Sequence, residues 1–130
     1  MSYVTSLTIV APINITLALV PVLFTWTYTE ANPGESPLNN DSMLVVGYYD
    51  DDFPDELMYV DAWNIDIRNE QYSTVITVPP GKTLKSSNDY IIRLGCTSKD
   101  VQPELYTYTE KSVSIFNLLS PIYGPPGYAN

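Results

Sequence analysis

The segment from Val22 to Thr29 alternates between large apolar side chains and threonines. Val22, Phe24, Trp26 and Tyr28 share one parity, and the threonines occupy the other. Because side chains alternate between the two faces of a strand, this pattern predicts a β-strand with one large apolar face. Trp26 is the bulkiest side chain on that face, and we expect it at the centre of a core sealed between two layers of strands.

Shorter segments of the same kind recur along the chain, with Pro, Gly, Asn and Ser between them. Strands are predicted at residues 3–10, 13–19, 21–30, 43–49, 57–67, 72–78, 89–97 and 105–118, the last as a hairpin or one bulged strand. Tyr90, Ile92 and Leu94 are predicted to point inward and Arg93 outward, and Trp63 is also predicted to point inward. Seven or eight short strands without a helix of ordinary length predict an all-β fold, an immunoglobulin-like antiparallel β-sandwich over residues 1–119. Residues 120–130 are predicted to form an extended, irregular tail rich in Pro, Gly and Tyr.

The net charge of −9 is unevenly distributed, because no Lys or Arg precedes Arg68. The first 67 residues carry 10 acidic side chains and no basic one, whereas the remainder carries 5 acidic and 6 basic side chains. This balance argues against nucleic acid and anionic membrane surfaces as partners. It is compatible with a soluble acidic protein, or with an acidic face that meets a cationic or hydroxyl-rich partner.

The uncharged segment from Leu7 to Trp26 is long enough for a membrane span to be considered. Pro12, Asn14 and Pro21 interrupt it, and its alternating threonines are typical of strands, so we predict no membrane span. Cys96 is the single cysteine, and the chain therefore cannot form an internal disulfide.

Candidates for catalysis are few. The chain has no histidine, which excludes Ser-His-Asp and Cys-His arrangements and histidine metal sites, and it has no glycine-rich phosphate loop. We therefore predict a protein that is not an enzyme, with no catalytic residues, no cofactor and no metal. The dense acidic segment from Asp50 to Glu56 leaves calcium as an alternative to a solvated turn, although its spacing does not fit an EF-hand.

Several segments together resemble one known family. An early strand ends at a proline (Leu7, Ile9, Pro12), and Phe24 to Tyr28 carries the Trp-Thr-Tyr sequence. Further matching segments are Asn64 to Asp66, then Tyr72 with Thr77, Val78 and Pro79, the Ser-Ser-Asn-Asp-Tyr-Ile-Ile-Arg-Leu run over residues 86–94, and the strand from Ser112 to Phe116. Over residues 7–118 the chain resembles the fungal Kre9/Knh1-type cell-wall synthesis domain, whose members are often Ser/Thr-rich and lipid-anchored.

The resemblance implies an immunoglobulin-like sandwich that supports wall glucan, and an extracellular or cell-wall location. The printed sequence shows no leader, no Ser/Thr-rich stalk and no hydrophobic anchor tail, so a leaderless intracellular protein is the alternative. Pro21 stands where such domains often have glycine before the tryptophan strand. Asn14 and Asn40 begin N-glycosylation sequons, which matter only if the chain is secreted.

Aromatic residues surround the acidic segment, where rings can stack on sugars and carboxylates can accept hydrogen bonds from sugar hydroxyls. Our first hypothesis is a non-enzymatic module that binds or organises wall glycan. Its predicted contacts are Tyr48, Tyr49, Asp51, Asp52 and Tyr59. The competing interpretation is that these rings, with Phe53 and Trp63, only pack in the core and at its rim.

Two alternatives have other functional residues. A self-assembling structural protein would form a homo-oligomer or filament through an apolar N-terminal edge strand and the C-terminal tail. Its predicted contacts are Tyr3, Leu7, Ile9, Tyr123 and Tyr128. The least favoured hypothesis is a glycan hydrolase that uses Asp51 and Asp52 as paired carboxylates.

Overall fold

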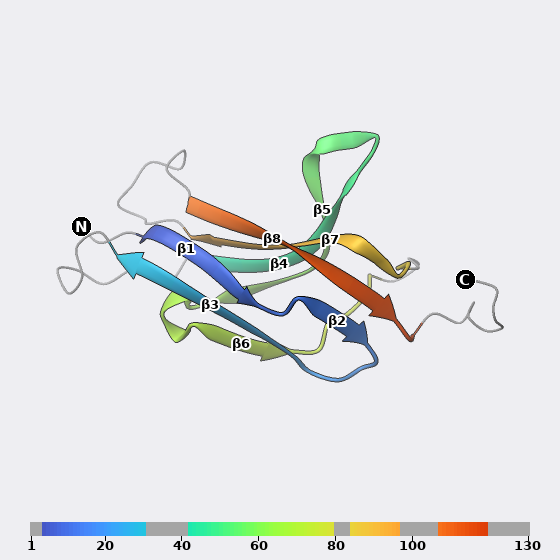
Figure 1. Ribbon diagram of the computed structural model, residues 1–130, viewed down its shortest axis with the longest axis horizontal. Coiled ribbons are helices and arrows are strands. Elements are labelled where there is room, and N and C mark those ends of the chain that lie inside the picture. The colour runs from blue at the N-terminus through green and yellow to red at the C-terminus, as the bar shows by residue number, and fades with distance from the viewer. Residues whose placement is uncertain (1–3, 31–41, 80–83, 97–106, 120–130) are drawn as a thin grey trace.

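The computed structural model describes residues 4–30, 42–79, 84–96 and 107–119, and the predicted tail over residues 120–130 lies outside them. Within these ranges there are eight strands and a single 3-10 helix (Figure 1). The elements are β1 (Val4–Ala11), β2 (Asn14–Leu17), β3 (Val22–Glu30), β4 (Ser42–Asp50), β5 (Phe53–Ile65), η1 (Ile67–Asn69), β6 (Gln71–Thr74), β7 (Ser87–Cys96) and β8 (Thr107–Asn117). Residues 107–117 form one strand rather than a hairpin, and the strand predicted over residues 72–78 is shorter, since β6 ends at Thr74.

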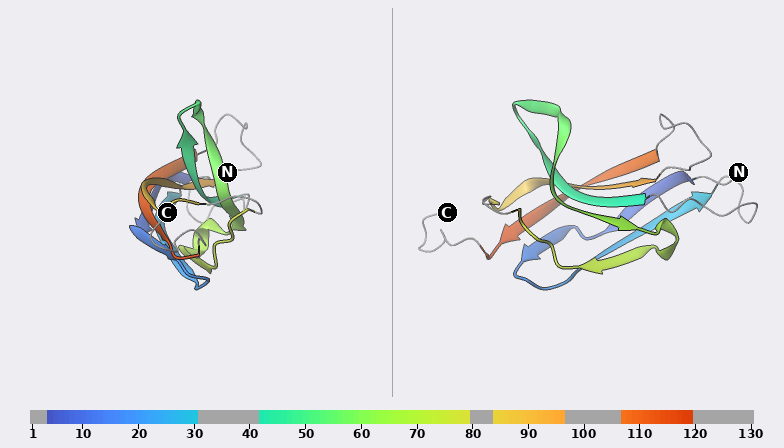
Figure 2. Two further views of the ribbon diagram at one scale, coloured as in Figure 1. Left: turned by 90° about the vertical axis from the view of Figure 1, so that its right-hand side faces the viewer. Right: turned by 180° about the vertical axis from the view of Figure 1, so that it is seen from behind.

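The strands form two sheets that face each other in two layers (Figures 1 and 2). One sheet has three strands in the order β1-β3-β6, and the other has five in the order β2-β8-β7-β4-β5. The predicted all-β sandwich is therefore confirmed.

The chain passes from one sheet to the other between β1 and β2. β1 pairs with β3 in the antiparallel sense. After the cis Ala11–Pro12 peptide bond, β2 pairs with β8 in the parallel sense, with Ile15 beside Ile115. The prediction of a wholly antiparallel arrangement was wrong for this pair, because alternation within a strand defines its faces but not its neighbour.

The core lies between the sheets, and Trp26 is in it with 2% of its surface exposed. Phe24, two positions before it on β3, is fully buried. Trp63 is only partly buried, and the centroid of its ring lies 5.7 Å from that of the Phe24 ring. Tyr90, Ile92 and Leu94 are buried, as their alternation predicts, while Arg93 lies on the outer face. The period-2 pattern thus identified the inward side of β3 and β7 correctly.

β4 and β5 form a long hairpin whose tip projects from the sandwich (Figures 1 and 2). The acidic turn expected over residues 50–56 is shorter in the structure. It occupies only Asp51 and Asp52, and β5 begins at Phe53. The pairing shifts register between Val46 and Gly47, which is a β-bulge or irregularity. Such a shift bends and twists a hairpin locally.

None of the helical structure in the described ranges is long and apolar enough to cross a membrane. The uncharged segment considered as a span, Leu7 to Trp26, instead contributes to β1, β2 and β3.

Candidate functional site

A pocket of about 410 Å³ lies beside the β4–β5 hairpin. Three separate parts of the chain contribute to it: the hairpin, the segment after β6, and the segment that leads into the start of β7. The lining residues are Tyr48, Tyr49, Asp50, Asp51, Tyr59, Val60, Val78, Pro79, Leu84, Lys85, Ser87, Asp89 and Tyr90. Its volume is that of a site for a small ligand or a short segment of a polymer.

The hairpin supplies three tyrosines to the pocket, of which Tyr48 and Tyr59 differ in exposure. Tyr48 packs against the core, whereas Tyr59 is 49% exposed. Both lie close to the register shift at Gly47, where β5 comes so near that a Cβ atom added to Gly47 would overlap the Met58 carbonyl oxygen. The glycine therefore allows the close strand approach that fixes Tyr59 relative to Tyr48.

Tyr90 forms a buried part of the pocket wall and is held at both its ring and its hydroxyl. Its ring meets the Tyr48 ring edge-on at 6.1 Å between centroids, and its hydroxyl donates a 2.6 Å hydrogen bond to the Lys85 carbonyl. Burial, followed by the neighbouring Tyr48, raises the pKa of Tyr90 to about 12. The phenol is therefore protonated at neutral pH and acts as a fixed donor.

Two hydrogen-bonded side chains hold the irregular segments of the wall in place. Asp61 accepts a 2.8 Å hydrogen bond from the Thr77 amide, next to Val78 and Pro79. The buried Asn117 side chain donates from Nδ2 to the Leu84 carbonyl at 2.6 Å, and the backbone amide of Asn117 donates to Ser86 Oγ at 2.9 Å. Strands β5 and β8 thus anchor the segments that complete the pocket.

Tyr49 links the pocket to a polar cluster on the outer face of the five-stranded sheet. Its hydroxyl donates to Glu110 Oε2 at 2.6 Å and accepts from Arg93 Nη2 at 2.9 Å. Arg93 also forms an ion pair with Glu110, and its guanidinium lies 4.6 Å from the ring centroid of Tyr108. The hydrogen bond to Glu110, with some burial, raises the pKa of Tyr49.

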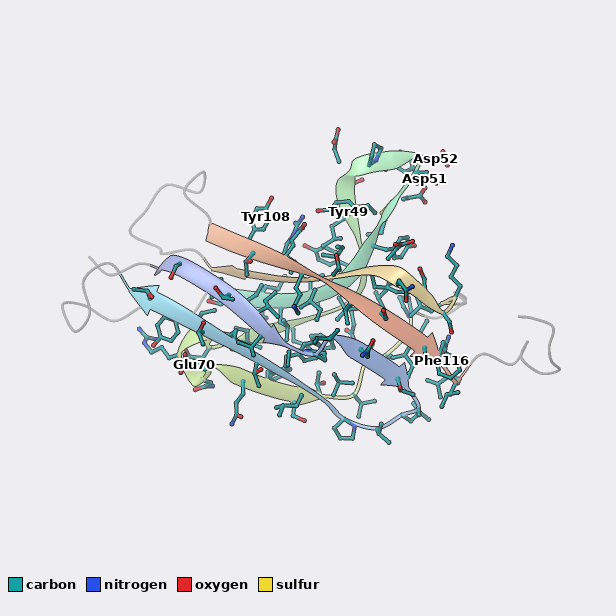
Figure 3. All side chains as sticks on the ribbon, in the orientation of Figure 1. Tyr49, Asp51, Asp52, Glu70, Tyr108 and Phe116 are labelled. Atoms are coloured by element: carbon teal, nitrogen blue, oxygen red, sulfur yellow. The ribbon has the colours of Figure 1, made fainter. Side chains whose placement is uncertain are left out.

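The structure brings together four of the five residues predicted to contact glycan: Tyr48, Tyr49, Asp51 and Tyr59. Asp52 is not among the pocket residues, and it lies with Asp51 at the hairpin tip (Figure 3). Prediction from the hairpin sequence alone missed Lys85, Asp89 and Tyr90. In the sequence these residues belong to a polar segment that is followed by an inward-pointing tyrosine. Nothing in that segment indicates that it packs beside the hairpin.

The residues predicted for assembly are placed differently. Leu7 and Ile9 belong to the core, with 9% and 6% of their surfaces exposed, so their side chains do not line the outer edge of β1. Tyr3, Tyr123 and Tyr128 lie outside the described residues. Large apolar side chains are instead exposed in the β2–β3 connection and at the end of β8, namely Leu19, Val20, Phe116 and Leu118.

A search for metal ligands among the described residues and comparisons with known proteins identify no further feature of this site. Among the described residues, no group of three or more Cys, Asp or Glu side chains is arranged to hold a metal ion. Asn14, the first residue of one sequon, is exposed, and Asn40 lies outside the described ranges. Searches of protein-family models, curated proteins and solved structures found no match to this chain.

Proposed function

We propose that this protein is a non-enzymatic β-sandwich module that binds glycan in the pocket beside the β4–β5 hairpin. The observation that carries the proposal is that Tyr48, Tyr59 and Tyr90 come together in one pocket with the carboxylates of Asp51 and Asp89. Aromatic rings provide apolar surfaces for the faces of sugar rings, and carboxylates accept hydrogen bonds from sugar hydroxyls.

The arrangement favours binding over turnover. Tyr90 and Tyr49 use their hydroxyls in hydrogen bonds to protein groups, the Lys85 carbonyl and the Glu110 carboxylate, which commits both hydroxyls to the fold rather than to chemistry on a bound glycan. Of the two carboxylates considered for a hydrolase, only Asp51 reaches the pocket. The glycan hydrolase is therefore the less favoured hypothesis.

The strand pairing supports an immunoglobulin-like architecture. A three-stranded sheet packs against a five-stranded sheet, and β8, β7, β4 and β5 are consecutive neighbours in the five-stranded sheet. The resemblance of residues 7–118 to the fungal cell-wall synthesis family implies wall glycan as the ligand and the cell wall as the location. Both belong to the proposal.

Retention on insoluble polysaccharides tests the binding function. We expect the protein to sediment with β-glucan or chitin, and Tyr59→Ala to weaken retention, because it removes the most exposed aromatic ring of the pocket. Tyr108→Ala is the matched control, since Tyr108 is 51% exposed and lies outside the pocket. Absence of retention on every polysaccharide, or equal loss in both variants, contradicts the proposal.

Self-association is a second candidate, and exposed apolar side chains at one end of the molecule favour it. Leu19 and Val20 follow β2, and Leu118 follows β8, where its amide donates to the Leu17 carbonyl at 3.0 Å. Leu19 is 71% exposed and has a positive φ of 59°, which is uncommon for leucine. A second copy of the chain could cover this apolar end.

Light scattering at high concentration tests self-association. If this end is an interface, the full chain forms oligomers and Leu19→Ser or Leu118→Ser reduces their size. The chain ending at Leu119 measures the contribution of residues 120–130. A monomer at all concentrations excludes assembly without affecting the glycan proposal.

A further inference from the structure

The pocket carries an excess of negative charge. Among the described residues that line it, Asp50, Asp51 and Asp89 are acidic and Lys85 alone is cationic. Asp50 has a structural role within the hairpin, because its Oδ1 accepts a 2.9 Å hydrogen bond from the Asp52 amide at the turn. Asp51 and Asp89 are both exposed and can therefore face a ligand.

Arg93 lies on the outer face of the five-stranded sheet and is not among the residues that line the pocket. Arg93 is held by Glu110, with Nη2 to Oε2 at 2.6 Å, and by the Tyr49 hydroxyl. Its remaining face covers the Tyr108 ring. These contacts hold its positive charge on the outer face of the five-stranded sheet, so the described lining of the pocket keeps more acidic than basic side chains.

The same pocket presents aromatic faces, and aromatic faces also attract cations. The ring quadrupole draws an ammonium group, and a nearby carboxylate adds to the attraction. Tyr59 is 49% exposed and lines the pocket together with Asp51, and Tyr48 stands two positions before Asp50 in the chain. A sugar with a protonated amino group satisfies both features, because its ring can stack while its ammonium group meets a carboxylate.

We infer that the pocket selects glycans that carry free amino groups, such as glucosamine polymers, over neutral glycans, and that it rejects uronic acid and sulfated glycans. The inference rests on the proposed glycan-binding function and specifies its ligand. The protein's overall charge of −9 acts in the same direction, because it repels anionic polymers at long range.

Paired oligosaccharides of equal length test the inference. Titrations at low salt and slightly acidic pH compare a glucosamine oligomer, its fully acetylated form, a β-glucan oligomer and an oligouronate. We expect the glucosamine oligomer to bind about tenfold more tightly than the acetylated one, a difference of about 1.4 kcal/mol. Raising the ionic strength from about 0.01 M to about 0.15 M should shrink this preference, since the screening length falls from about 30 Å to about 8 Å.

Charge-neutral variants locate the effect. Asp51→Asn and Asp89→Asn should each reduce the preference for the amino sugar about threefold or more while leaving acetylated and β-glucan oligomers bound as before. Asp55→Asn is the matched control, because Asp55 is exposed on β5 but lies outside the pocket.

The remaining outcomes separate this inference from the proposed function. Equal affinity for both oligomers, with Tyr59→Ala still weakening both, overturns the charge selection and leaves glycan binding in place. A preference that Asp55→Asn reduces as much as Asp51→Asn overturns the selection by the pocket. Absence of binding to any oligomer overturns both.

Discussion

Trp26 and Ile67 are joined by a 2.8 Å hydrogen bond from the indole Nε1 to the backbone carbonyl, although 41 positions separate them in the sequence. The backbone amide of Trp26 also donates to the Glu70 carbonyl at 3.0 Å, so the residue contacts both ends of η1. η1 follows β5 in the five-stranded sheet and precedes β6 in the three-stranded sheet. Trp26 therefore fixes the connection by which the chain crosses between the layers.

Replacing this indole should be costly. Trp26→Phe removes the donor to Ile67 and part of the buried ring volume, and we expect it to lower the free energy of unfolding by about 2–4 kcal/mol. Urea denaturation followed by circular dichroism measures the change. Trp63→Phe, at the partly buried tryptophan, is the control and should cost less; equal costs would show that Trp26 has no special role.

Gly47 should tolerate no side chain. A Cβ atom at this position would overlap backbone at Met58, which cannot rotate away, so Gly47→Ala should destabilise the protein by about 3 kcal/mol or more. Thermal melting compares it with Ser112→Ala on the exposed face of β8, which should remain near wild type. An unchanged melting temperature in Gly47→Ala would contradict the close approach of β4 and β5.

The buried phenol of Tyr90 predicts a loss of stability at alkaline pH. Its pKa is raised to about 12 in the folded protein, from 10.0 for an unperturbed tyrosine. Because the unfolded chain releases this proton first, the stabilising contribution is complete below pH 10 and disappears as the pH rises through about 12.

Denaturation at pH 8 and pH 11 measures this effect against Tyr90→Phe. The wild type should lose about 1–2 kcal/mol more than the variant between these pH values, since each pKa unit corresponds to about 1.4 kcal/mol. At pH 8 the variant should be about 1 kcal/mol less stable, because it lacks the hydrogen bond to Lys85. Parallel pH profiles for the two proteins would exclude the raised pKa.

Tyr49 and Glu110 should be energetically coupled. Their 2.6 Å hydrogen bond lies in a partly exposed cluster that includes Arg93. A double-mutant cycle with Tyr49→Phe and Glu110→Gln should give a coupling energy of about 0.5–1.5 kcal/mol. Additive effects of the two substitutions would mean that the contact contributes nothing to stability.

Local pattern was sufficient for the fold class because alternation is a property of each strand. Trp26 on β3 and Tyr90 on β7 were placed inward correctly, and burial of both is observed. Pairing was not predictable in the same way. Nothing in Asn14 to Leu17 indicates that this strand leaves the first sheet and joins β8 in parallel.

Of the candidate site, only the wall formed by the hairpin could be predicted, because its residues are close in sequence. Tyr48, Tyr49 and Asp51 are close in sequence, and Tyr59 lies on the other strand of the hairpin, paired with Gly47, so the sequence alone suggested a cluster. The opposite wall depends on long-range hydrogen bonds, such as that from Asn117 to Leu84, 33 positions apart. Asp52 was included because of its charge, but it is not among the residues that line the pocket.

Chemical-shift mapping with a soluble glucosamine or β-glucan oligomer tests the central claim most directly. Glycan binding in the pocket predicts that the shifted amides lie at residues 48–51, 59–60 and 85–90, and that Tyr59→Ala abolishes the shifts. Shifts confined to residues 13–23 and 116–119, or no shifts with either oligomer, would contradict it.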